Sequence, residues 1–191
     1  MRLRLLVLPI AAIGIFAAVE YRLAQELDPE SDDSRRGAVA IPQQLALAPT
    51  FEARDAQLNF FRLDRFLGRH AVFVVFFDQE AGAAGSEILQ HLKSHDADLR
   101  RTGTRVVGVS CALPQQNRKW ECPDSFDLVT DLEQQWEIHR QWGLFDEATR
   151  ETRSAVFYID RAGRVAMRAG VPVPLEEPDR KIDELLGVQH D

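Results

Sequence analysis

The sequence is poor in cysteine. Its 191 residues include only Cys111 and Cys122. Two cysteines are too few for a disulfide scaffold, and they lack the paired spacing of a structural zinc site. The sequence therefore predicts no disulfide-rich secreted fold, no metal site and no bound cofactor.

The sequence also lacks a cluster of basic residues. It holds 23 Lys and Arg against 30 Asp and Glu, a formal net charge of -7, and these charges are scattered. Because nucleic-acid binding needs a concentrated basic face, nucleic acid is not expected as a partner. Hydrophobic residues at 45% and charged residues at 28% are ordinary globular values. They exclude a disordered chain and a polytopic membrane protein.

One long apolar run is present, Leu5–Val19, preceded by Arg2 and Arg4. Its length fits the core of a signal peptide or a short membrane anchor. Residues 17–20, which read AAVE, offer no clean A-x-A cleavage site, so an uncleaved anchor is favoured over a cleaved signal. The segment 1–25 is therefore a signal-anchor or signal peptide. The positive residues before the run place the rest of the chain outside the cytoplasm.

The remaining chain divides into a linker and one domain. Residues 26–47 are rich in acids, Pro and Ser and show little periodicity, which is typical of a linker. Residues 48–191 alternate apolar runs with amphipathic segments. They are long enough to bury the core of a single domain.

Within this domain the patterns predict strands joined by helices. Continuous apolar runs are typical of strands covered on both faces. The expected order is a hairpin at 51–61, a helical turn at 62–68, a strand at 71–77, a helix at 86–100, a strand at 104–110, a helix at 114–121, a strand at 126–131, a helix at 132–143, a hairpin at 155–170 and a helix at 176–187. Parallel strands with crossover helices, followed by an antiparallel hairpin, predict an α/β thioredoxin-like sandwich with a mixed central sheet.

From about Ala48 to Leu186 the chain resembles the redoxin superfamily, and within it the alkyl hydroperoxide reductase and thiol-specific antioxidant group, the peroxiredoxins. The order and spacing of several segments together carry the resemblance. They are APTF at 48–51, RLDRFLGRHAVFVVFF at 62–77, RVVGVS at 105–110, FDLVTD at 126–131, QWG at 141–143 and AVFYIDRAGRV at 155–165.

The resemblance implies a catalytic site in the loop after residue 77. The family has there a Pro, three variable residues, a Thr or Ser, two more residues and the peroxidatic Cys at a helix N-terminus. This sequence has Asp78, Gly82 and Gly85 at the three positions. The family's second Arg falls at Ser154, with Arg153 displaced by one. The resemblance thus implies a degenerate site without its nucleophile.

Cys111 and Cys122 are the remaining candidate thiols, and both are weak. Neither has a basic or His neighbour in the local sequence that would lower its pKa, so each is interpreted first as a small, partly buried hydrophobe. The predicted helix between them would hold them too far apart for a disulfide. His139 is interpreted as a surface residue.

Two functions stay open. The first is a membrane-anchored, exported redoxin domain that has lost peroxidase activity and holds a protein partner as a binding or scaffold module. The second is a thiol-dependent peroxidase or oxidoreductase of cell redox homeostasis that uses Cys111 or Cys122. The missing motif separates the two and favours the first.

Overall fold

A computed structural model describes residues 45–132, 136–170 and 178–187. The chain divides into two compact units, Met1–Ala38 and Val39–Asp191. The first unit, and with it the predicted anchor and most of the linker, lies outside the described residues, so both stay predictions. Among the helices that the structure describes, none is long and apolar enough to cross a membrane.

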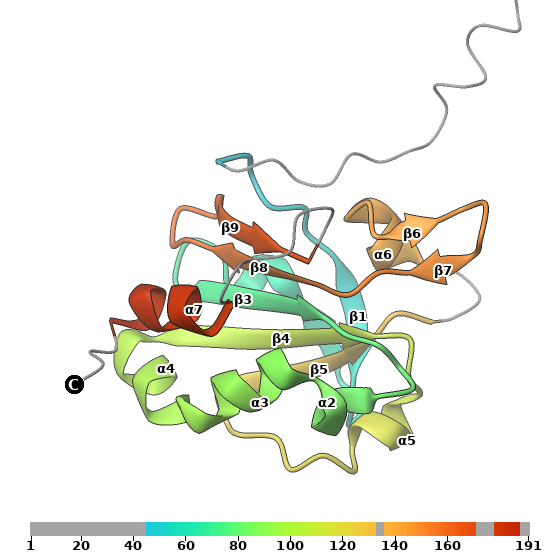
Figure 1. Cartoon of the computed structure of the whole chain (residues 1–191), viewed down its shortest axis with the longest axis horizontal. Coiled ribbons are helices and arrows are strands. Elements are labelled where there is room, and N and C mark those ends of the chain that lie inside the picture. Colours follow the sequence, from blue (N-terminus) through green and yellow to red (C-terminus); the bar gives the residue numbers. More distant parts are fainter. Residues whose placement is uncertain (1–44, 133–135, 171–177, 188–191) are drawn as a thin grey trace, which may run out of the picture. The chain divides into compact units, whose positions relative to one another are not determined.

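A seven-stranded mixed sheet forms the centre of the second unit (Figure 1). Its order is β2-β1-β5-β4-β3-β8-β9, with β3, β4 and β5 parallel and the remaining neighbours antiparallel. The predicted mixed α/β sheet is confirmed. The strand bounds are Glu52–Asp55 (β1), Phe60–Arg62 (β2), Ala71–Phe76 (β3), Thr104–Ser110 (β4), Phe126–Thr130 (β5), Ala155–Ile159 (β8) and Val165–Ala169 (β9).

Strand β3 separates the two hydrophobic cores. All six of its residues are buried. Side chains alternate across a strand, so Val72, Val74 and Phe76 enter one core with Trp142. Phe73 and Val75 enter the other core, together with Leu89, Leu92, Leu99 and Ile182.

Short helices cover the two faces of the sheet. Their bounds are Leu63–Arg65 (the 3₁₀ helix η2), Gly82–Gly85 (α2), Glu87–Ser94 (α3), Asp96–Thr102 (α4), Pro114–Asn117 (α5), Glu137–Gln141 (α6) and Pro178–Leu186 (α7). Helices α3, α4 and α7 supply leucines and an isoleucine to the core that contains Phe73 and Val75. They lie along one face of the sheet in Figure 1, whereas α6 packs its Ile138 into the opposite core.

The helix predicted over 86–100 is interrupted at His95. Nδ1 of the His95 ring lies 3.0 Å from the carbonyl oxygen of His91. In a continuous helix the backbone N–H of His95 would donate to that same oxygen. The backbone N–H donates to Leu92 O and Lys93 O instead. Local competition by a side chain thus divides the segment into α3 and α4.

Two further differences lie near the end of the sheet that carries the site. The helices predicted over 114–121 and 132–143 are shorter, at Pro114–Asn117 and Glu137–Gln141, and residues 133–135 lie outside the described part. A small hairpin that the sequence did not predict pairs β6 (Phe145–Asp146) with β7 (Glu151–Thr152).

Candidate functional site

The loop after β3 folds into a single tight turn. The backbone N–H of Gly82 donates to Asp78 O at 3.0 Å, and that of Gly85 donates to Ala81 O at 3.2 Å. The Asp78 carboxylate accepts from the backbone N–H of Glu80 at 2.6 Å. These bonds form α2, directly before the Ser86 side chain caps α3 by accepting from the Leu89 N–H.

Two glycines shape this turn. Gly82 has a φ of +62°, a left-handed conformation that strains any residue with a Cβ. A Cβ at Gly85 would lie 3.0 Å from the Cβ of Ala81, which is closer than packed carbon atoms prefer. A β-branched Thr at position 82 would therefore strain the backbone, and a Cys at position 85 would crowd Ala81.

A pocket of about 370 Å³ opens beside this turn. We call it the loop pocket. It combines four segments of the chain: the loop after β3, the residue after β4, the residue before α6, and the stretch from Arg150 through β7 to Ser154. Its lining residues are Asp78, Gln79, Glu80, Cys111, Trp136, Arg150, Glu151, Thr152 and Ser154.

Three of the predicted site residues, Asp78, Cys111 and Ser154, therefore meet in the loop pocket. Arg153 does not line it. Its guanidinium forms a salt bridge with Asp146 at 3.0 Å. The cation in the pocket wall is Arg150, whose guanidinium carbon lies 5.2 Å from the centre of the Trp136 ring.

Sequence reasoning missed Arg150 because its place depends on the β6–β7 hairpin. Arg150 has a φ of +58° at the turn of that hairpin. A left-handed residue other than glycine is uncommon and leaves no clear signature in a single sequence.

Cys111 has a buried histidine and carboxylate behind it. Its Sγ lies 3.9 Å from Nδ1 of His139, and the same nitrogen lies 2.6 Å from Oδ2 of Asp131. The backbone N–H of His139 donates to that oxygen at 2.8 Å. Cys111 is 8% exposed, Asp131 3% and His139 1%.

This arrangement corrects one prediction, because His139 is not a surface residue. It also gives Cys111 a His neighbour in space that the local sequence does not contain, since 28 positions separate the two. Topology contained a signal for it. Cys111 follows β4 and Asp131 follows β5, and parallel neighbouring strands end at the same edge of a sheet.

The hydrogen bond to Asp131 limits what His139 can do for Cys111. A carboxylate accepts, so Nδ1 carries the proton that it donates to Asp131. A protonated Nδ1 cannot take the proton of the Cys111 thiol. It can stabilise a Cys111 thiolate only as a nearby dipole, or as a charge when the whole ring is protonated.

Cys122 lies away from the loop pocket. The residue as a whole is exposed to solvent. Its S–H nevertheless points to the protein and donates to the carbonyl oxygen of Phe126 at 3.5 Å. Burial of the sulfur, followed by the negative charge of Asp127, raises the pKa of Cys122 to about 11. A thiol with this pKa is a poor nucleophile at neutral pH. Neither Cys111 nor Cys122 forms a disulfide.

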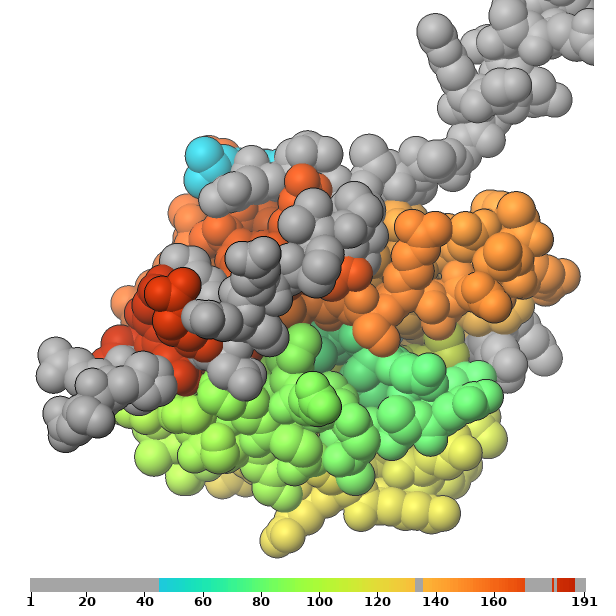
Figure 2. Space-filling model, in the orientation of Figure 1, coloured from blue at the N-terminus to red at the C-terminus, as the bar shows by residue number. Residues whose placement is uncertain are grey.

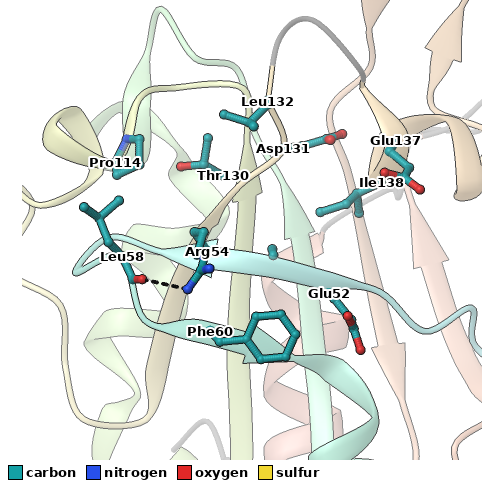
Figure 3. A pocket seen from close by; sticks show the side chains of 11 residues that line it. Glu52, Arg54, Leu58, Phe60, Pro114, Thr130, Asp131, Leu132, Glu137 and Ile138 are labelled. Carbon is teal, nitrogen blue, oxygen red and sulfur yellow. Dashed lines mark hydrogen bonds between the residues drawn. The ribbon is translucent and has the colours of Figure 1, made fainter.

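A second hollow, of about 300 Å³, lies between the β1–β2 hairpin and α6 (Figure 3). Its exposed apolar side chains are Leu58, Phe60 and Leu132. Asp131 lines this hollow while Cys111 lines the loop pocket. The buried His139 therefore lies between two surface depressions.

Comparison with known proteins places this geometry. The AhpC/TSA family matches residues 46–168. The chain belongs to the AhpC/TSA family. The predicted resemblance to peroxiredoxins is thereby confirmed.

Solved structures show that this AhpC/TSA domain has the thioredoxin-like fold. It is similar to a thiol peroxidase from Chromobacterium violaceum, with a TM-score of 0.59, 15% identity, and coverage of 78% of this chain and 88% of that one. It is also similar to peroxidoxin BcpB from Mycobacterium tuberculosis, with a TM-score of 0.60, 16% identity, and coverage of 78% of this chain and 99% of that one. A putative thiol:disulfide interchange protein DsbE from Chlorobium tepidum matches with a TM-score of 0.58, 18% identity, and coverage of 77% of this chain and 98% of that one. No curated protein matches the sequence.

Proposed function

We propose that this AhpC/TSA domain does not reduce hydroperoxides and instead binds a partner protein through the loop pocket. The main evidence for this proposal is the turn that contains Gly82 and Gly85. Gly85 stands where the family has its sulfur, and the left-handed Gly82 stands where the family has a hydroxyl. Without a thiolate at this position, the family's attack on a peroxide oxygen has no nucleophile.

The charge of the loop pocket indicates what it would bind. Asp78, Glu80 and Glu151 line it against one cation, Arg150, and all four residues are exposed. The pocket is therefore acidic and open to solvent. A partner segment that carries Lys or Arg side chains complements it, and this complementarity would speed association and select the partner.

The N-terminal run sets where such binding would occur. The apolar residues Leu5–Val19, preceded by Arg2 and Arg4, support a membrane anchor with the domain outside the cytoplasm. The acidic linker of residues 26–47 would separate the domain from the bilayer. The proposed partner is then a membrane or extracytoplasmic protein with a basic segment.

A second candidate function is thiol oxidoreduction by Cys111. Two observations favour it: Cys111 lines the loop pocket, and His139 Nδ1 lies 3.9 Å from its sulfur. The similarity in fold to the putative thiol:disulfide interchange protein adds support. The proton that Nδ1 donates to Asp131 counts against an activated thiolate, so this candidate stands second.

Peptide binding tests the first candidate. A fluorescent tetralysine peptide and its tetraglutamate counterpart are titrated with the full chain in detergent at low ionic strength. We expect only the tetralysine peptide to bind, and Glu80→Lys with Glu151→Lys to weaken that binding by about tenfold or more. Glu121→Lys with Asp124→Lys, two exposed charge reversals that leave the loop pocket unchanged and alter the net charge by the same amount, is the control. Equal losses in both variants would mean that net charge alone attracts the peptide and would overturn the proposal.

A further inference from the structure

Two histidines and one aspartate meet on the face of the sheet opposite α6. His91 comes from the last turn of α3, His95 from the break between α3 and α4, and Asp183 from α7. One ligand atom of each lies within 4.8 Å of the other two. Helix α7 packs against α3 and α4, and Figure 2 shows its red surface next to the yellow-green surface of α4. We call these three residues the His-His-Asp cluster.

The hydrogen bonds of His95 leave its Nε2 suited to hold a metal. The His95 Nδ1 lies 3.0 Å from His91 O, and a carbonyl oxygen can only accept. In the neutral ring Nδ1 therefore carries the proton, and the lone pair is on Nε2. That Nε2 lies 3.6 Å from Oδ1 of Asp183. Donation by the second ring nitrogen to a carbonyl is the usual support of a metal-binding histidine.

The spacing of the ligand atoms fits a tetrahedral ion. Ligands at 2.0–2.1 Å in a tetrahedron lie about 3.3 Å from one another. Oδ1 of Asp183 lies 3.0 Å from Nε2 of His91 and 3.6 Å from Nε2 of His95. These two distances bracket the tetrahedral edge, and the third separation, between the two imidazole nitrogens, is within 4.8 Å. Rotation of the two imidazole rings toward each other would bring all three ligands onto one ion.

Burial and charge favour a dication at this position. The Asp183 side chain is 4% exposed, and its carboxylate faces two imidazoles. The imidazoles are 19% and 22% exposed, which leaves a path from solvent. Imidazole and carboxylate ligands suit zinc and its first-row neighbours, and the absence of sulfur from this donor set argues against Cu(I).

From this geometry we infer that the His-His-Asp cluster is a binding site for Zn²⁺, with water as the fourth ligand. In the metal-free protein His91 Nε2 donates to Asp183 at 3.0 Å, so the proton on that nitrogen leaves or moves to Nδ1 when the ion binds. The bound ion joins α7 to α3, segments that are 92 positions apart. The site is independent of the loop pocket and of the proposed partner.

Zinc titration of the full chain tests this inference. The protein is purified in detergent, freed of any affinity tag and treated with chelator, and ZnCl₂ is then titrated by calorimetry. We expect one ion per chain. Asp183→Asn, His91→Gln and His95→Gln should each weaken binding on the order of 100-fold, because each removes one of three ligands. The control His70→Gln changes a histidine whose Nδ1 bonds Gly103 O, and it should bind zinc as the wild type does. His190→Ala tests the histidine outside the described residues.

A second readout does not depend on the variants folding. Co²⁺ in the wild-type chain should give the intense visible spectrum of a tetrahedral site, and excess Zn²⁺ should abolish it. X-ray absorption of the zinc-loaded chain should show two imidazoles among light-atom ligands. No zinc binding by the folded wild type, unchanged affinity in Asp183→Asn and His95→Gln, or loss of binding in His190→Ala would overturn the inference.

Discussion

Nδ1 of His139 lies 2.6 Å from Oδ2 of Asp131, with both side chains almost fully buried. The pair connects the end of β5 to α6 next to Cys111, so it supports the wall of the loop pocket. Removing one member of a buried, hydrogen-bonded pair leaves the other without its partner, which is costly.

We therefore predict that Asp131→Ala and His139→Ala each lower the free energy of unfolding by about 3–5 kcal/mol, as measured by urea denaturation followed by circular dichroism. The matched control is Glu147→Gln, which removes the exposed ion pair between Arg140 and Glu147. That change should leave the urea midpoint almost unaltered because exposed pairs are screened by water. Equal effects at both pairs would contradict the structural role given to Asp131 and His139.

Cys122 should make stability depend on alkaline pH. Its folded pKa is raised to about 11 from an ordinary value of 9.0, so the folded state holds the proton more tightly than the unfolded state does. The contribution is complete below about pH 9 and is lost as the pH rises toward about 11. Urea midpoints measured across this range should fall less in Cys122→Ser than in the wild type. Identical pH profiles would show that the thiol is not held in this environment.

The glycine turn should resist restoration of the family motif. Gly82→Ala should cost about 1–2 kcal/mol of stability because its φ of +62° is left-handed. Ala84→Ser, an exposed change within the same turn, should cost little. The double variant Gly82→Thr with Gly85→Cys should gain no reductant-dependent peroxidase activity. Peroxide would oxidise a reactive new cysteine to a sulfenic acid, which dimedone labels. Rapid peroxide-dependent labelling by dimedone would therefore show that the turn accepts the family chemistry.

Arg150 and Arg153, the residues on either side of β7, should have different effects on the binding of a basic peptide. Arg150 lines the acidic loop pocket, whereas Arg153 pairs with Asp146 outside it. Arg150→Ala should tighten binding of the tetralysine peptide by about threefold, since one repulsive charge is removed. Arg153→Ala should change it less. Fluorescence anisotropy at low salt measures both, and the reverse order would exclude the loop pocket as the binding site.

The sheet was predictable because its strands are long apolar runs. Residues 71–77 and 104–110 contain little besides β-branched, aromatic and small residues, and both form central strands. Helix lengths were less predictable. The break at His95 depends on one side-chain hydrogen bond, which does not change the spacing of Leu89, Leu92 and Leu99.

The candidate site was predicted in part. Asp78, Cys111 and Ser154 were singled out from the sequence, and they meet in one pocket. His139 was misplaced because burial of a polar residue depends on a partner eight positions away, Asp131, and not on local hydropathy. Arg150 and Asp183 gave no local signal at all.

Reductant-dependent peroxide consumption tests the central claim most directly. The full chain is assayed with hydrogen peroxide and with an alkyl hydroperoxide, in the presence of dithiothreitol or thioredoxin, beside an active peroxiredoxin as positive control. We predict that peroxide disappears no faster than with the reductant alone, because Gly85 supplies no sulfur to attack it. Catalytic turnover by the wild type that is lost in Cys111→Ser and kept in Cys122→Ser would contradict the account, and it would assign the chemistry to the thiol beside His139.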